Sequence, residues 1–133
     1  MGYRSDVSII FYARGNRNDA GENALLKLWF DENYPVAVAK DEWQASIRQK
    51  DNAIIVDYED VRWYPDYDHV KAVTAALGQF EETFKCDEED TRYAWETARI
   101  GEEDNDIEID RSDYCDGLFY VTRQIRVDMV GID

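Results

Sequence analysis

The chain has 133 residues, of which 44% are hydrophobic and 14% aromatic, and its formal net charge at pH 7 is −15. This apolar content excludes a disordered chain, which lacks the residues needed to build a core. The charge disfavours direct binding to nucleic acid or to an anionic membrane, because both require outward Lys and Arg side chains. We therefore expect one folded domain, residues 1–133, that is steered toward basic partners.

The chain begins with a predicted strand and a predicted helix. Residues 6–13 are rich in β-branched and aromatic side chains, which is typical of a central strand. The polar residues 14–18 predict a turn, and residues 19–33 predict a helix capped by Asp19. The apolar stripe expected on this helix is Ala24, Leu25, Leu28 and Trp29.

The next part of the chain is ambiguous and is followed by a clear strand. We expect a short strand or extended link at residues 36–38 and one or two helical turns at residues 41–49. Residues 52–63 predict a strand, because apolar residues alternate along it. The side chains expected on one side of this strand are Ile54, Val56 and Tyr58.

The second half predicts one helix followed by strands. Residues 69–82 have the helical period, and residues 91–100 have the alternation of a strand. Ile107 and Ile109 alternate with acidic residues, which indicates another strand, and residues 118–130 predict the last one. The buried face expected on the helix is Val70, Val73, Thr74, Leu77 and Phe80.

This order of elements predicts an α+β fold. We expect a mostly antiparallel sheet of about four to five strands, with two main helices packed on one face. The predicted core is Ile9, Phe11, Leu25, Leu28, Ile54, Val56, Val70, Val73 and Leu77.

Three blocks of the sequence carry a resemblance to a known family. They are GYRSDV at residues 2–7, DVRWYPDY at residues 60–67 and RIGEEDNDIE at residues 99–108. Together they resemble a family of small uncharacterised proteins of bacteriophages and prophages. The resemblance implies a phage origin and a role as an accessory protein that acts on host machinery. It supplies no catalytic residue.

Metal binding and catalysis have weak signals. Asp104, Asp106 and Glu108 alternate like the start of a calcium loop, but the required Gly and Glu are replaced by Ile109 and Cys115. The single histidine, His69, begins a helix, and no serine lies in a G-x-S-x-G elbow. We therefore expect no cofactor and no enzyme, and a small metal-dependent enzyme is the last of the alternatives.

The remaining signal is negative charge. Residues 81–116 hold fifteen acidic and four basic residues, so most of the net charge lies there. Asp104, Asp106, Glu108 and Asp110 alternate, so on a strand these four carboxylates point to one side. Their spacing would be about 6.6 to 6.8 Å, which is twice the rise of about 3.4 Å per phosphate in B-DNA. This pattern predicts an anionic face that imitates nucleic acid, made of Glu88, Glu89, Asp90, Glu102, Glu103, Asp104, Asp106, Glu108 and Asp110.

We therefore expect an inhibitor that binds the basic nucleic-acid site of a host complex, such as a CRISPR, restriction or transcription complex. An alternative is an accessory or assembly protein whose acidity serves only solubility, and which contacts its partner through Trp63, Tyr64 and Tyr67. Cys86 and Cys115 lack the spacing of a disulfide framework or a zinc site. Without a signal peptide or an apolar run long enough to span a membrane, the expected location is the host cytoplasm. The oligomeric state stays open.

Overall fold

The protein is represented by a computed structural model, which describes residues 3–14, 20–34, 45–50, 52–103, 105–121 and 125–127. Its elements are β1 (Ser5–Ala13), α1 (Ala20–Asn33), β2 (Ala45–Lys50), β3 (Ala53–Val61), α3 (Asp68–Phe84), β4 (Tyr93–Gly101), β5 (Ile107–Arg111), β6 (Phe119–Val121) and β7 (Ile125–Val127). The first five strands form an antiparallel sheet in the order β2-β3-β1-β4-β5, and β6 and β7 form a separate two-stranded ribbon. The predicted α+β fold is confirmed.

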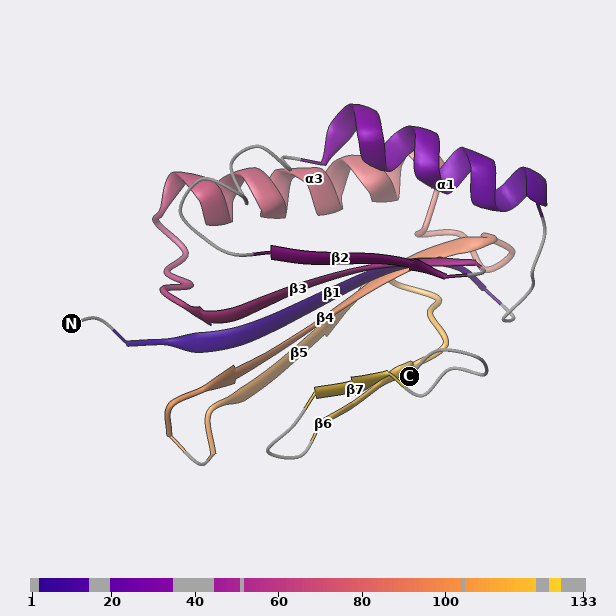
Figure 1. The fold of residues 1–133 in the computed structure, drawn as a ribbon. Helices are drawn as coiled ribbons and strands as arrows, with labels where there is room; N and C mark the ends of the chain where they lie inside the picture. The colour runs from indigo at the N-terminus through magenta and orange to yellow at the C-terminus, as the bar shows by residue number, and fades with distance from the viewer. Residues whose placement is uncertain are drawn as a thin grey trace.

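A large aromatic core lies between the sheet and the helices. Both helices lie on the same side of the sheet (Figure 1). The β1 residue Phe11 points to this side, and its ring lies 5.3 Å from that of Trp29 in α1 and 5.1 Å from that of Phe80 in α3. Aromatic rings suit this position because each buries a large apolar area. The other buried side chains of this cluster include Val7, Ile9, Leu26, Phe30, Ile54, Val56, Tyr58, Val70, Val73 and Ala76.

The predicted stripe of α1 is correct at Trp29 and wrong at Ala24, Leu25 and Leu28, which are exposed. Leu25 and Leu28 are 52% and 55% exposed, whereas Leu26, Trp29 and Phe30 are buried. The buried three are spaced i, i+3 and i+4 and so share one face of the helix. The helix has apolar residues on most of its faces, so the periodicity of its sequence alone does not show which face is buried. The contact of the Trp29 and Phe30 rings with Phe11 does.

Two further expectations are corrected by strand pairing. The helical turns expected at 41–49 are wrong for residues 45–49, which belong to β2, where Ile47 pairs with Val56 of β3. The single strand expected at 118–130 is instead the β6–β7 ribbon, in which Phe119 pairs with Val127. In α3, Thr74 is exposed rather than buried, and Leu77 is half-buried. The expectations for Asp19 and for residues 36–38 lie outside the described residues.

The opposite face of the sheet is held by a buried carboxylate. Glu96 of β4 is fully buried and accepts hydrogen bonds from the Tyr12 hydroxyl at 2.5 Å, the Leu118 N–H at 2.9 Å and Arg111 Nε at 3.1 Å. A buried carboxylate is stable when its oxygens are paired in this way. Glu96 therefore fastens the segment after β5 to the sheet, and the β6–β7 ribbon lies on the same side (Figure 1).

The sheet also separates the two cysteines. Cys86 belongs to the core on the helix side, whereas Cys115 packs against the cluster on the opposite face. Both thiols are free.

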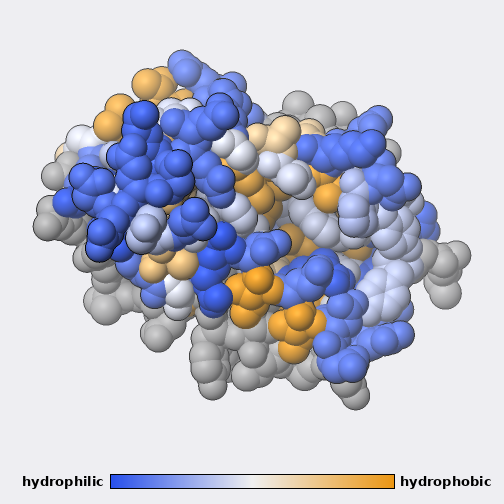
Figure 2. Space-filling view, turned by 180° about the vertical axis from the view of Figure 1, so that it is seen from behind, coloured by the Kyte–Doolittle hydropathy of each residue, from blue (hydrophilic) through white to orange (hydrophobic). Residues whose placement is uncertain are grey.

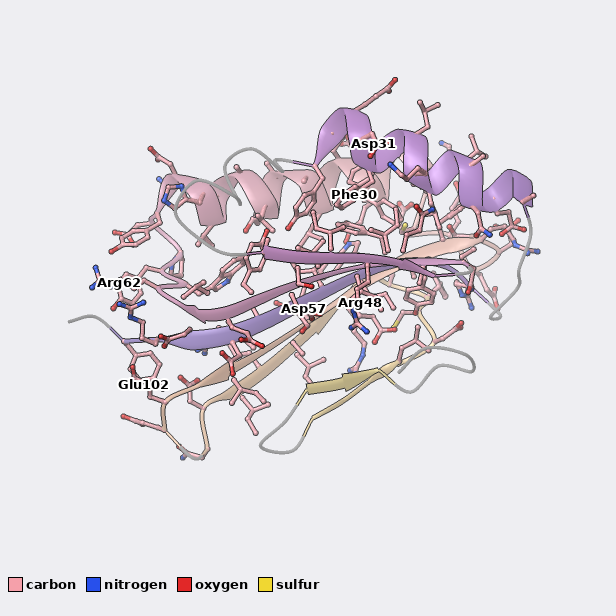
Figure 3. The ribbon with its side chains drawn as sticks, in the orientation of Figure 1. Phe30, Asp31, Arg48, Asp57, Arg62 and Glu102 are labelled. Carbon is pink, nitrogen blue, oxygen red and sulfur yellow. The ribbon has the colours of Figure 1, made fainter. Side chains whose placement is uncertain are left out.

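An ion pair between Arg48 and Asp57 lies on the side away from the helices, where their side chains point toward each other (Figure 3).

Candidate functional site

The acidic segment 101–110 begins at the last residue of β4 and ends within β5, and these two strands pair antiparallel as a hairpin. Its register pairs Arg99 with Glu108 and Thr97 with Asp110. The turn is closed by the Gly101 N–H, which donates to the carbonyl oxygen of Asp106 at 2.8 Å. Among the described acids of this segment, Glu108 and Asp110 lie in β5, whereas Glu102, Glu103 and Asp106 lie in the connection between the two strands.

Arg99 neutralises part of this charge. Its guanidinium donates to both carboxylate oxygens of Asp106, at 2.7 and 3.1 Å, and its Nε donates to Glu108 at 2.7 Å. Such forked pairs combine charge with fixed geometry. The guanidinium holds the pKa of Asp106 below its usual range. Asp106 and Glu108 therefore hold the hairpin together, whatever else they do.

Tyr3 and Gly101 complete this arrangement. The Tyr3 hydroxyl donates to Asp106 at 2.6 Å and accepts from the Glu103 N–H at 3.0 Å. The hydrogen bond to the Asp106 carboxylate raises the pKa of Tyr3. A Cβ atom at Gly101 would lie 2.8 Å from Asp106 Cγ and closer still to its Oδ2 and to the Tyr3 hydroxyl. Glycine is thus the residue that leaves space for this contact.

The predicted row of four alternate carboxylates is only partly present. Asp106 precedes β5, so of the row only Glu108 and Asp110 lie in the strand. Asp104 lies outside the described residues. Glu108 and Asp110 share the face of the sheet that is covered by the helices. Their partners Arg99 and Thr97 lie on that face, because they alternate along β4 with Glu96 and Ala98, which lie on the opposite face.

The other acidic residues predicted for the contact face form two separate groups. Glu88, Glu89 and Asp90 are exposed in the connection before β4, whereas Glu102 and Glu103 are exposed in the turn after it. Since β4 has nine residues, the strand alone separates the groups by roughly 26 Å. Glu102 also accepts from the Arg4 N–H at 2.8 Å, and it projects at the far end of the hairpin (Figure 3). The predicted contact face is therefore divided into two exposed acidic groups, one at each end of β4.

The aromatic alternative, Trp63, Tyr64 and Tyr67, lies in the connection between β3 and α3. All three side chains are half-buried. The Tyr64 hydroxyl accepts from the Tyr3 N–H at 2.6 Å, its ring lies 5.0 Å from that of Tyr67, and Trp63 and Tyr67 pack against the core. These contacts give each residue a structural role.

A pocket brings parts of the two predicted sites together. It lies between α3 and the β4–β5 side of the sheet and has a volume of about 340 Å³. Trp63 of the aromatic group and Glu108 and Asp110 of the acidic group all line it. Figure 2 shows apolar surface in a hollow near the middle of the rear face, with hydrophilic residues on both sides. The remaining lining residues are Val7, Ile9, Val73, Thr74, Leu77, Gly78, Glu81, Trp95, Thr97, Ala98 and Arg99.

Glu81 and Trp95 are pocket residues that sequence reasoning did not identify. The Trp95 indole N–H donates to the Glu81 carboxylate at 2.9 Å, which joins α3 to β4. One signal was available, because Trp95, Thr97 and Arg99 alternate and must share a face of β4. The contact with α3 depends on how the helix lies on the sheet, which no sequence period reports.

Other chemistry has little support in the described ranges. Within them, no three His, Cys, Asp or Glu side chains are grouped to hold a metal ion. His69 is half-buried beside the Tyr67 ring, at 6.3 Å between ring centroids. None of the helices in the described part of the chain combines the length and the hydrophobicity that a membrane span requires.

Comparison of the chain with protein-family models, with curated proteins and with solved structures finds no match. The resemblance to phage proteins therefore remains an expectation from the three sequence blocks. The site has to be interpreted from its own geometry.

Proposed function

We propose that the protein is a non-enzymatic inhibitor that occupies the basic nucleic-acid-binding surface of another protein. The observation that carries this proposal is the net charge of −11 in residues 81–116. These residues form the end of α3, the strands β4 and β5 and their connections. The charge is therefore concentrated near the β5 edge of the sheet. A concentrated field of one sign attracts an oppositely charged partner and speeds association.

The geometry supports imitation of a nucleic-acid backbone in two ways. Glu108 and Asp110 share a side at the strand spacing of about 6.6 to 6.8 Å, twice the phosphate rise of one DNA strand. The two exposed acidic groups also lie beyond opposite ends of β4, which is a span of about eight phosphates of one strand. A surface of this length resembles a short duplex more than a single acidic motif.

The kind of partner follows from this chemistry. Proteins that bind nucleic acid present Lys and Arg along a groove or channel, and an acidic edge competes for that surface. We propose that the partner belongs to a host CRISPR, restriction or transcription complex and that binding takes place in the host cytoplasm. This step relies on the resemblance to phage proteins.

Capture from bacterial lysate, with nucleic acid as competitor, tests the proposal. The immobilised protein is compared with one variant at each end of β4, namely Glu88→Gln/Glu89→Gln/Asp90→Asn and Glu102→Gln/Glu103→Gln. A matched control, Glu32→Gln/Glu59→Gln/Asp66→Asn, removes three exposed charges outside the acidic segment. Wash steps at about 0.05 and 0.5 M salt separate screened contacts from apolar ones.

We expect nucleic-acid-binding proteins to be captured at low salt, to be released by duplex DNA or by RNA, and to be lost from at least one acidic variant. The control should capture them as the unmodified protein does. If both acidic variants behave like the control, or if nucleic acid does not compete, the charge is only a solvated surface. The aromatic segment Trp63–Tyr67 is then the better candidate.

A further inference from the structure

We propose that the pocket between α3 and β4–β5 binds the guanidinium group of one arginine side chain presented by the protein partner. This inference rests on the proposed function, because it assumes a basic partner, but it concerns a single site with its own test. The rest of the acidic edge would steer the partner, and the pocket would hold one of its side chains.

The charge of the pocket lining favours a cation. Three carboxylates line it, those of Glu81, Glu108 and Asp110, against the one guanidinium of Arg99. That guanidinium is already engaged, since it donates to Asp106 and Glu108. Asp110 is exposed, and the pocket lining as a whole has an excess of negative charge. An anionic ligand would meet this excess, whereas a cation would offset it.

The aromatic lining favours a flat cation with an apolar stem. Trp63 and Trp95 are among the lining residues, together with the half-buried Leu77 and the buried Val7 and Ile9. Trp95 is held in place because its N–H donates to Glu81. Arginine stacks on aromatic rings and pairs with carboxylates through its planar fork of donors, and its methylene stem covers apolar surface. Lysine offers only a compact, strongly hydrated charge.

The part of α3 that lines the pocket includes a glycine, Gly78, which has no side chain to fill the space. Gly78 lies in the middle of α3 and lines the pocket, and a Cβ atom built there meets nothing within 4 Å. Its backbone has ordinary helical geometry, so no steric or conformational need for glycine is evident. Glycine is less favourable than alanine inside a helix.

The volume of about 340 Å³ lies in the range of about 300 to 1,000 Å³ found for small-ligand sites, so a single side chain fits.

The test uses N-acetyl-arginine amide as the probe and the intrinsic fluorescence of the tryptophans as the signal. N-acetyl-citrulline amide, which has nearly the same shape without the charge, is the matched control. We expect saturable binding of the arginine probe with a midpoint on the order of 1 mM, as befits so small a ligand. The citrulline probe should bind at least tenfold more weakly, and N-acetyl-lysine amide several-fold more weakly.

Two variants of the protein locate the site. Gly78→Leu adds a bulky side chain at a residue of the pocket lining where a Cβ atom meets nothing within 4 Å, so it should fold normally and weaken binding at least tenfold. Asp110→Asn should weaken binding about fivefold, because it removes one of the lining charges. The control Asp113→Asn, an exposed acid outside the lining, should bind as the unmodified protein does. Thermal melts confirm that each variant is folded.

Several outcomes would overturn the proposal. Equal binding of the citrulline probe would show that charge is not recognised, and equal or tighter binding of the lysine probe would exclude the guanidinium assignment. Unchanged binding by folded Gly78→Leu would place the probe elsewhere. Because this assay needs no partner, probe binding without lysate capture would refute only the proposed function. Capture without probe binding would refute only the pocket.

Discussion

Arg99 turns part of an acidic sequence into structure. Its guanidinium contacts Asp106, Glu108 and the Ser5 hydroxyl, so it connects the hairpin to the central strand β1. Two of the six carboxylates in residues 101–110 are thereby committed to the fold. Removing all alternate acids of the hairpin would disturb this contact as well as any partner surface, which is why the variants proposed above spare Asp106 and Glu108.

Gly101 provides a test of how tightly the hairpin turn is packed. Gly101→Ala should lower the free energy of unfolding by about 1 to 3 kcal/mol, because the new methyl group overlaps the Asp106 carboxylate and the Tyr3 hydroxyl. Urea unfolding followed by circular dichroism measures the change. Gly78→Ala is the matched control. It adds the same methyl group in open space inside a helix and should raise stability by about 0.5 to 1 kcal/mol. Equal effects of the two changes would contradict the close packing at Gly101.

At the scale of single elements, α1 has one buried face that can be probed directly. Leu26→Ala should cost about 2 to 5 kcal/mol, because Leu26 is almost fully buried beside Trp29 and Phe30. Leu25→Ala, the neighbouring change on the exposed face, should stay within about 0.5 kcal/mol. Chemical denaturation of the two variants decides between the faces. A larger loss for Leu25→Ala would restore the stripe expected from the sequence.

The elements differ in how far local sequence defines them. Strands β1, β3 and β4 and helix α3 were predictable, because each has one clear period and turn residues at its ends. Segment 45–50 was not, since a six-residue strand at the edge of a sheet is stabilised by its pairing with β3 rather than by its own residues. Tertiary contact decided both the conformation of β2 and the face of α1.

The candidate site shows the same division. The common side of Glu108 and Asp110 follows from strand alternation, and so was foreseen. The pairing of Arg99 with Asp106 and Glu108 depends on the hairpin register, which the hydrogen bond between Gly101 and Asp106 helps to set. The pocket joins α3, β4, β5 and Trp63, which lie far apart in sequence, so no local pattern could reveal it.

For the whole molecule, buried phenols predict how stability depends on pH. Burial raises the pKa of Tyr58 to about 12, and it raises the pKa values of Tyr34 and Tyr12 above their usual 10.0. In the unfolded chain these groups lose protons near pH 10, while the folded protein keeps them. The contribution of Tyr58 is therefore fully present below pH 10 and is lost as the pH rises through about 12, and the contributions of Tyr34 and Tyr12 also begin to fall above pH 10.

Urea unfolding between pH 8 and pH 12, with tyrosinate absorbance as a second signal, measures this loss. The Tyr34 and Tyr58 hydroxyls bond to each other at 2.6 Å, so the double variant Tyr34→Phe/Tyr58→Phe removes both without leaving a lone buried hydroxyl. Between pH 8 and pH 12, the free energy of unfolding of the double variant should fall clearly less than that of the unmodified protein. Tyr114→Phe, at an exposed site, should behave as the unmodified protein does. An unchanged slope in the double variant would show that these phenols do not control the alkaline limit.

The order of strands in the sheet also bears on how the protein is made. Strand β1 leaves the ribosome before the other four strands of its sheet, yet it occupies the centre of that sheet between β3 and β4. Its last residue, Ala13, is followed by 88 residues before Gly101 ends β4, which translation at about 5 to 20 residues per second adds in roughly 4 to 18 s. During that interval a strand with eight of nine residues destined for burial has no completed partner on one side. The nascent chain therefore presents an adhesive segment early, and we expect chaperones to influence the yield of this protein more than its final stability would suggest.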